Sequence, residues 1–130
     1  MPITPVADMV KAAKAEITTL SVADARAQID AGTALLVDIR DPRELDREGR
    51  VPDAFHAPRG MLEFWVDPAS PYHKEALATE KTLILMCAGA ARSALSAQTL
   101  QTMGMTNVAE LEGGFKGWKE AGAPLKTADK

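Results

Sequence analysis

LILMCAGAARSAL, residues 83–95, is the most informative stretch of this sequence and contains its only cysteine, Cys87. Four apolar residues at 83–86 predict a short buried strand, and a helix-forming run begins at Ala90. The small residues between them allow backbone N–H groups to turn inward. Unpaired amides at the start of a helix attract anions and lower the pKa of a thiol placed among them. The sequence therefore predicts a reactive cysteine in a strand-to-helix loop.

Strand and helix signals alternate along the rest of the chain. Strands are predicted at 17–20, 34–39, 55–56, 83–87 and 107–111. Helices are predicted at 5–15, 22–30, 42–48, 61–65, 72–78, 91–103 and 115–120. This alternation is typical of a three-layer α/β/α fold with a mainly parallel central sheet of about five strands. Ligands of such sheets bind at the C-terminal ends of the strands, where Asp38 and Cys87 both lie.

Length and composition favour one domain of an ordinary soluble protein. The chain has 130 residues, 25% of them charged, and a formal net charge of −3. Nothing in this balance predicts a nucleic acid or an anionic membrane as partner. A single cysteine excludes an internal disulfide. Because no signal-peptide core and no apolar run of roughly 20 residues is seen, we expect a cytoplasmic location that keeps the thiol reduced.

Three motifs together resemble the rhodanese-like sulfurtransferases. LLVDIRDPRELDREGRVPDAFHAPRG at 35–60 is similar to the family's first signature, a strand followed by Asp-x-Arg, a charged helix and Gly-x-x-Pro-x-Ala. CAGAARS at 87–93 is similar to its active loop of Cys, four residues, Arg or Lys, and Ser or Thr. GGFKGWKEAGAPL at 113–125 is similar to its closing Gly-Gly-aromatic-x-x-Trp motif. All three stand in order with the right spacing.

The resemblance implies a rhodanese-like domain over residues 17–126, with an N-terminal helical extension at 1–16 and a C-terminal tail at 127–130. It also implies a persulfide relay. Cys87 would take a sulfane sulfur from thiosulfate or a related donor and pass it to cyanide or a thiol. The expected partners are therefore a small anionic sulfur donor and a thiol or cyanide acceptor, with no cofactor and no metal.

The expected catalytic residues are Cys87 and Arg92. Arg92 is permanently cationic and is expected to hold an anionic donor or to lower the pKa of the thiol. The loop amides are expected to stabilise negative charge on the sulfur. The predicted substrate-binding residues are Ala88, Gly89, Ala90, Ala91, Ser93, Arg59 and Trp65. Asp38 and Arg40 are expected to brace the first motif near the site, because a carboxylate at a buried strand end needs a partner.

Some positions depart from the family's pattern. Arg50 stands where the family often has His, and Asp53 replaces the glycine that follows. In the loop, Gly89 stands where many members have another residue, and Ala90 stands where many have glycine. Position 90 therefore decides whether the loop keeps the family geometry, since glycine adopts positive φ more readily than alanine.

Two other functions stay open at this stage. A cysteine-based phosphatase or arsenate reductase of related architecture places five residues between Cys and Arg, whereas Cys87 and Arg92 are separated by four. The tighter ring favours one sulfur over a phosphoryl group. A non-catalytic binding or sensor module is the other alternative, although it would not require this cysteine and arginine. His56 and His73 lack the spacing of zinc ligands and are expected to be ordinary side chains.

Overall fold

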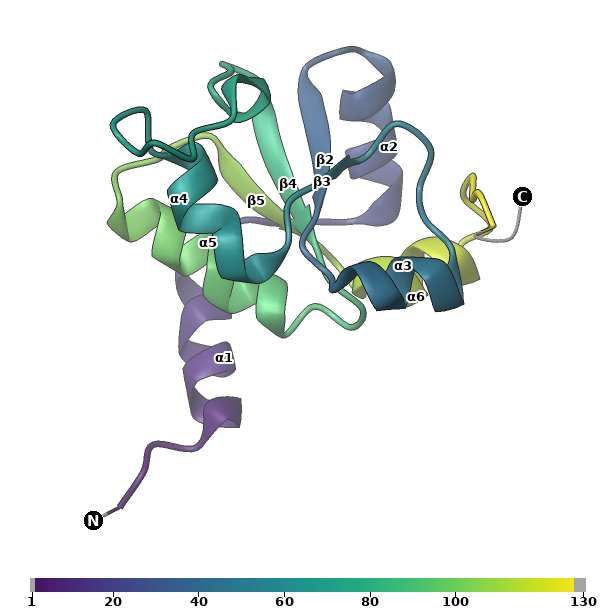
Figure 1. Cartoon of the computed structure of the whole chain (residues 1–130). Helices are drawn as coiled ribbons and strands as arrows, with labels where there is room; N and C mark the ends of the chain where they lie inside the picture. The colour runs from purple at the N-terminus through teal and green to yellow at the C-terminus, as the bar shows by residue number, and fades with distance from the viewer. Residues whose placement is uncertain (1, 128–130) are drawn as a thin grey trace.

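A five-stranded parallel sheet runs through the centre of the computed structural model, which describes residues 2–127 (Figure 1). The strands lie in the order β1-β5-β4-β2-β3, and each neighbouring pair is parallel. Their bounds are β1 Thr19–Leu20, β2 Ala34–Asp38, β3 Phe55–His56, β4 Thr82–Met86 and β5 Val108–Leu111. The predicted α/β fold with about five mainly parallel strands is confirmed.

Helices cover both faces of this sheet. Their bounds are α1 Val6–Glu16, α2 Val22–Asp30, α3 Pro42–Glu48, α4 Leu62–Val66, α5 Arg92–Thr102 and α6 Gly114–Glu120. The α4 and α5 helices pack against one face, and α2 and α6 pack against the other (Figure 1). Short 3₁₀ turns lie at Arg59–Met61 and Glu75–Leu77.

One predicted helix, at 72–78, is wrong. Within this segment the structure has only the 3₁₀ turn. Its backbone N–H groups donate to a nearby side chain and to a distant carbonyl instead of to a helical ladder. The N–H of Tyr72 bonds to the Ser70 hydroxyl, and the N–H of Lys74 donates to the carbonyl of Trp65. These bonds hold the segment against α4 instead of allowing a regular helix to propagate.

Strand β4 lies at the centre of the sheet and is buried on both faces. Leu83 and Leu85 pack into the cluster beneath α4 and α5, while Ile84 and Met86 pack into the cluster beneath α2 and α6. The alternation follows from the two-residue period of a strand. Hydrogen bonds join β4 to β2 on one side and to β5 on the other. The N–H of Ile39, which follows β2, donates to the carbonyl of Met86, the residue just before Cys87.

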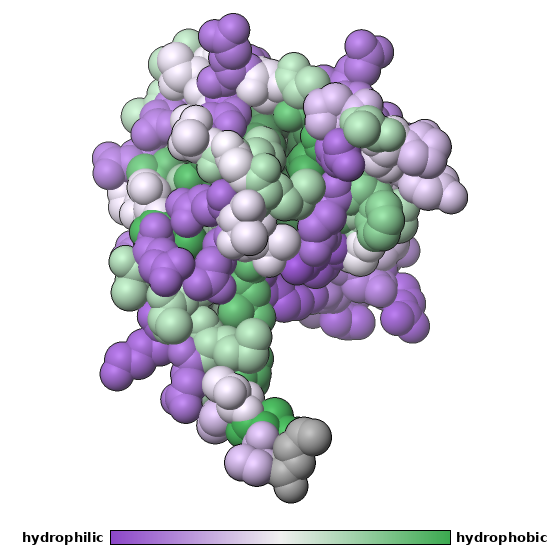
Figure 2. Space-filling view, turned by 90° about the vertical axis from the view of Figure 1, so that its left-hand side faces the viewer, coloured by the Kyte–Doolittle hydropathy of each residue, from purple (hydrophilic) through white to green (hydrophobic). Residues whose placement is uncertain are grey.

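The N-terminal helix α1 packs on α5, while its first turns project from the body (Figures 1 and 2). Ile3, Val6 and Met9 are exposed along this projecting part. The division between an extension at 1–16 and a domain at 17–126 stays a prediction. Of the predicted tail, residues 128–130 lie outside the described residues. Within the described chain, no helix has the length and apolar character that crossing a membrane requires.

Candidate active site

The sulfur of Cys87 lies inside a turn formed by the residues between β4 and α5. Cys87 is only 1% exposed. The backbone N–H of Ala90 donates to Sγ at 3.1 Å, and the N–H of Ser93 donates at 3.4 Å. The Ser93 hydroxyl oxygen lies 3.6 Å from Sγ. The loop thus directs amide donors at the sulfur itself, while Ala88 and Gly89 are exposed above it.

These contacts change the ionisation of the thiol. Burial raises the pKa of Cys87, but hydrogen bonds from the side chain and backbone of Ser93 and from the N–H groups of Gly89 and Ala90 lower the pKa by more in total. The net direction is below the ordinary value for a thiol. Because the thiolate is the nucleophilic form, the loop raises the reactive fraction of Cys87 at neutral pH.

Ala90 adopts a left-handed backbone conformation with φ of +71°. This conformation costs an L residue about 1–2 kcal/mol and is ordinarily given to glycine. The left-handed residue turns the chain between the N–H of Ala90 and the N–H of Ser93, both of which donate to the sulfur. Asp53, with φ of +65°, is the other non-glycine residue at positive φ in the described chain. At both positions a left-handed turn is therefore formed without glycine.

Helix α6 closes the loop from the side of the third motif. The N–H groups of Phe115 and Lys116 donate to the carbonyls of Cys87 and Ala88, at 2.7 and 3.1 Å. A Cβ at Gly114, whose φ is +61°, would lie 2.5 Å from the Cys87 carbonyl oxygen. The motif therefore contains glycine because the helix can approach the loop only where no side chain intervenes.

Arg92 forms a two-armed ion pair with Glu44 of α3. Its Nη1 and Nη2 groups donate to the two carboxylate oxygens at 2.8 and 2.9 Å. The Arg92 side chain is 42% exposed, and that of Glu44 is 19% exposed. The hydrogen bond from Arg92, opposed by burial and assisted by the N–H of Asp41, lowers the pKa of Glu44 to about 2. The same pair raises the pKa of Arg92.

Sequence reasoning missed Glu44 because it also has a local role. Its carboxylate accepts the N–H of Asp41 and completes a capping box at the start of α3. The spacing of Asp41 and Glu44 explains a helix start without any reference to Arg92. Only the fold shows that this cap lies beside the Cys87 loop.

Asp38 and Arg40 lie below the loop as a fully buried pair. The guanidinium donates from Nε and Nη2 to the carboxylate, with the shorter bond at 2.7 Å. Nη2 also donates to the carbonyl of Gly49 at 2.9 Å, and the Phe115 ring lies 4.1 Å from the guanidinium carbon. His56 Nε2 lies 2.7 Å from the Arg40 carbonyl. These contacts tie the end of β2 to α3 and α6.

Arg59 and Trp65 make their observed contacts around α4. Arg59 pairs with Glu63 at 2.6 Å. Trp65 packs edge-on against Phe55 with 6.2 Å between ring centres, and Lys74 lies 5.0 Å from the ring. None of these contacts joins either residue to the Cys87 loop. Their predicted part in substrate binding therefore stays a prediction.

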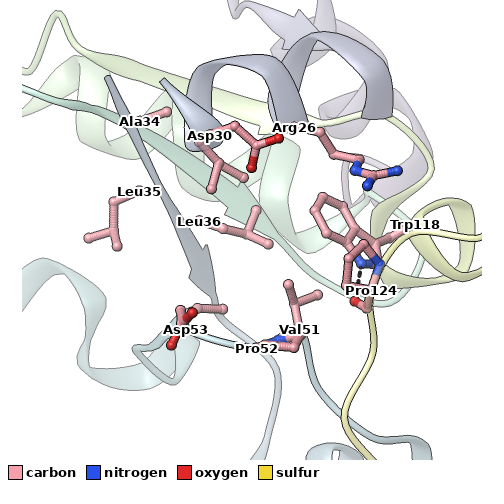
Figure 3. Close-up of a pocket in the computed structure, with 12 residues that line it drawn as sticks. Arg26, Asp30, Ala34, Leu35, Leu36, Val51, Pro52, Asp53, Trp118 and Pro124 are labelled. Atoms are coloured by element: carbon pink, nitrogen blue, oxygen red, sulfur yellow. Dashed lines mark hydrogen bonds between the residues drawn. The ribbon is translucent and has the colours of Figure 1, made fainter. Parts of the chain in front are cut away.

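Two cavities differ in their relation to the loop. One of about 280 Å³ reaches Ala88 and is otherwise lined by Arg40, Glu44, Arg47, Glu48, Phe115, Lys116 and Lys119. The other, of about 240 Å³, lies between α2, β2 and the chain around Trp118 and Pro124, and contains no residue of the loop (Figure 3). Across residues 2–127, no group of three His, Cys, Asp or Glu side chains is placed to hold a metal.

Comparisons with known proteins identify the fold and its relatives. A solved structure from Rhodopseudomonas palustris, described as a protein of unknown function and possible tyrosine phosphatase, is 46% identical with a TM-score of 0.89; the match covers 97% of this chain and 99% of that one. The polysulfide-sulfur transferase homodimer from Wolinella succinogenes is 33% identical with a TM-score of 0.70, covering 92% and 85% of the two chains.

The family comparison is consistent with these structures. Thiosulfate sulfurtransferase GlpE of Actinobacillus pleuropneumoniae is 33% identical over 95 residues, 73% of this chain and 80% of the relative. The chain spans only 60% and 45% of the length of two further curated relatives. The family description "Rhodanese-like domain" matches residues 21–121. The chain therefore belongs to the rhodanese-like domain family, which the three motifs predicted.

Proposed function

We propose that this chain is a sulfurtransferase whose Cys87 accepts a sulfane sulfur from thiosulfate or a related donor. The observation that carries this proposal is the direction of the loop amides. The N–H groups of Ala90 and Ser93 converge on Sγ at 3.1 and 3.4 Å, which suits an anionic sulfur at that point. The sulfurtransferase names of the relatives from Wolinella and Actinobacillus support the same chemistry.

The proposed reaction has two displacement steps. The Cys87 thiolate attacks the outer sulfur of thiosulfate, so that a new S–S bond forms while the bond to the sulfite sulfur breaks and its electron pair leaves with sulfite. The outer sulfur now forms a persulfide on Cys87. Cyanide or a thiolate then attacks this sulfur, and the electron pair of the broken S–S bond returns to Cys87. No further oxidant, reductant or cofactor is required.

Arg92 is assigned to the donor in this proposal. Its guanidinium is partly exposed at the open side of the loop, where an anionic donor competes with Glu44 for the same N–H groups. An arginine held by a carboxylate is kept in a fixed orientation and exchanges one anion for another. The acceptor is a small thiol or cyanide, and a reducing compartment such as the cytoplasm keeps Cys87 as a thiol.

A cysteine-based phosphatase is the second candidate, favoured by the description of the Rhodopseudomonas palustris structure. The length of the loop disfavours it. Only four residues separate Cys87 from Arg92. A phosphoryl group needs a wider ring of amides for its three oxygens.

Intact-mass spectrometry after incubation with thiosulfate tests the proposal. We expect a mass gain of one sulfur atom in the wild-type chain and none in Cys87→Ser. Transfer to cyanide is followed in parallel as thiocyanate formation. Hydrolysis of an aryl phosphate faster than thiocyanate formation would favour the phosphatase, and no sulfur gain with several donors would favour a non-catalytic binding module.

A further inference from the structure

A series of polar contacts, buried at Cys87 and partly buried at its far end, leads from Cys87 to the N-terminal helix. The Ser93 hydroxyl, 3.6 Å from Sγ, donates to Glu110 Oε1 at 2.8 Å. The other carboxylate oxygen accepts Lys14 Nζ at 2.6 Å and Thr19 Oγ1 at 3.0 Å. The participating groups come from the loop, α5, β5, β1 and α1. They connect the sulfur to a helix that lies outside the central sheet.

Among these hydrogen-bonded residues, Glu110 is the one whose presence is not explained by a contribution to stability. It is fully buried in β5 between Ala109 and Leu111, which are also buried. A buried carboxylate loses its hydration and is frequently no more stabilising than an apolar residue of similar size, even when it is paired. The reaction steps proposed above do not use it. Its contact with the Ser93 hydroxyl places its charge one side chain away from the nucleophile.

The Ser93 hydroxyl has one proton and two candidate acceptors. These are the Glu110 carboxylate and, when it is ionised, the sulfur of Cys87. A hydroxyl proton points to one acceptor at a time. When it points to Glu110, the sulfur keeps the backbone N–H groups of Ala90 and Ser93 as donors but receives no hydroxyl proton. When the carboxylate charge is removed, the proton is released to stabilise the thiolate.

Lys14 controls how strongly Glu110 holds that proton. Its side chain is 39% exposed, whereas that of Glu110 is fully buried, so the ammonium group joins the buried carboxylate to solvent. The positive charge of Lys14 reduces the electrostatic effect of the carboxylate at the sulfur. It also makes the carboxylate a weaker hydrogen-bond acceptor for Ser93. Lys14 and Glu110 therefore act on Cys87 with opposite signs.

We propose that Glu110 and Lys14 are positioning residues that set, through the Ser93 proton, how readily Cys87 ionises. This inference rests on the proposed function, in which the Cys87 thiolate is the nucleophile. Glu110 disfavours the thiolate and Lys14 restores it. The N-terminal helix is then a working part of the active site, because it supplies the cation that makes the buried carboxylate tolerable beside a nucleophile.

Other charged groups face the loop from the elements packed around it. Arg92 is paired with Glu44, and Asp38 is paired with Arg40. The cavity beside Ala88 adds Arg47, Glu48, Lys116 and Lys119. All of these groups are unchanged in variants of Lys14 and Glu110. A shift measured between such variants therefore reports Lys14 and Glu110, and the Ser93→Ala background isolates the part that passes through the hydroxyl.

Titration of the single thiol tests the proposal directly. Because Cys87 is the only cysteine, the ultraviolet absorbance of the thiolate against pH, corrected with Cys87→Ser, follows this one group. Lys14→Met keeps an apolar stem and removes the charge, and we expect the titration midpoint to rise by about one pH unit. Lys14→Arg is expected to stay near the wild type. Lys11→Met, an exposed cation on the same helix, is the matched control and should not shift.

Variants of the carboxylate give the opposite sign. Glu110→Gln is expected to lower the midpoint, and the double variant Lys14→Met/Glu110→Gln should lie between the two single variants. In a Ser93→Ala background the effect of Glu110→Gln should shrink, because the transmitting hydroxyl is gone. Thermal melting checks that each variant folds. If Glu110→Gln does not fold, the comparison of Lys14→Met with Lys14→Arg decides.

The outcomes separate this inference from the proposed function. A folded Lys14→Met that titrates like Lys11→Met overturns the inference, even if the wild-type chain gains a sulfur atom from thiosulfate. Absence of sulfur gain in the wild type overturns the proposed function instead, whatever the titrations show. The inference is supported if the titration midpoint rises in Lys14→Met and stays near the wild-type value in Lys14→Arg.

Discussion

Arg92 and Ser93 are neighbours in sequence but lie in opposite environments. Arg92 reaches outward to Glu44, with 42% of its side chain exposed, whereas Ser93 turns inward to the fully buried Glu110. Water and salt weaken the outer contact more than the inner one, whose carboxylate is fully buried. One helix start therefore supplies an exchangeable contact on the side open to substrate and a fixed contact on the side of the core.

The largest effect on stability is expected on the inner side, from Ser93→Ala. It leaves one oxygen of the buried Glu110 carboxylate without a donor, which costs about 1–3 kcal/mol. Ser96→Ala is the matched control, because Ser96 is also buried on α5 but donates to an uncharged acceptor, the Arg92 carbonyl. Urea unfolding measures both. Equal losses of unfolding free energy would contradict a special role for the inner contact.

Glu44→Gln tests the outer side through pH. Arg92 lowers the pKa of Glu44 from an ordinary 4.5 to about 2. The pair therefore stabilises the fold in full above pH 4.5, and the stabilisation is lost as the pH falls through 2. Because Arg92 is 42% exposed, screening reduces the expected contribution to about 1 kcal/mol.

The measurement for the outer side is unfolding free energy against pH. Glu44→Gln should flatten the slope between pH 4.5 and 2. Asp46→Asn changes an exposed carboxylate of the same helix and should leave the slope as it is. If both variants have the wild-type slope, the ion pair does not stabilise the fold.

Since Glu44→Gln also leaves Arg92 free for an anionic donor, the KM for thiosulfate should fall.

The smallest effect is expected from Ala90→Gly, in the turn that precedes both side chains. Relief of the left-handed conformation gains about 1–2 kcal/mol, and the greater freedom of glycine in the unfolded chain loses about 0.5–1 kcal/mol. A net gain of up to about 1.5 kcal/mol follows. Ala12→Gly, at an exposed position inside α1, has no strain to relieve and should only destabilise. Thermal melting of the two variants should give shifts of opposite sign.

The sequence was sufficient to predict the sheet and the loop because both are encoded locally. The apolar run at 83–86 is long enough for one buried strand, and the small residues after Cys87 leave room for inward amides. The contacts beyond the sulfur are not local. In the sequence, Glu110 is a single polar residue in a short strand. Nothing near it in the sequence indicates that Lys14 forms an ion pair with it. Its flanking apolar residues, Ala109 and Leu111, were the one available signal of burial.

The missing side chain at Gly114 has a consequence for protein synthesis. The carbonyls of Cys87 and Ala88 receive their donors from Phe115 and Lys116, which leave the ribosome after the loop does. A nascent chain that ends before Gly114 therefore carries the cysteine without the support that shapes its loop. The hydrogen bonds that support the loop around the thiol are complete only when α6 docks, which is when most of the described domain is available to fold.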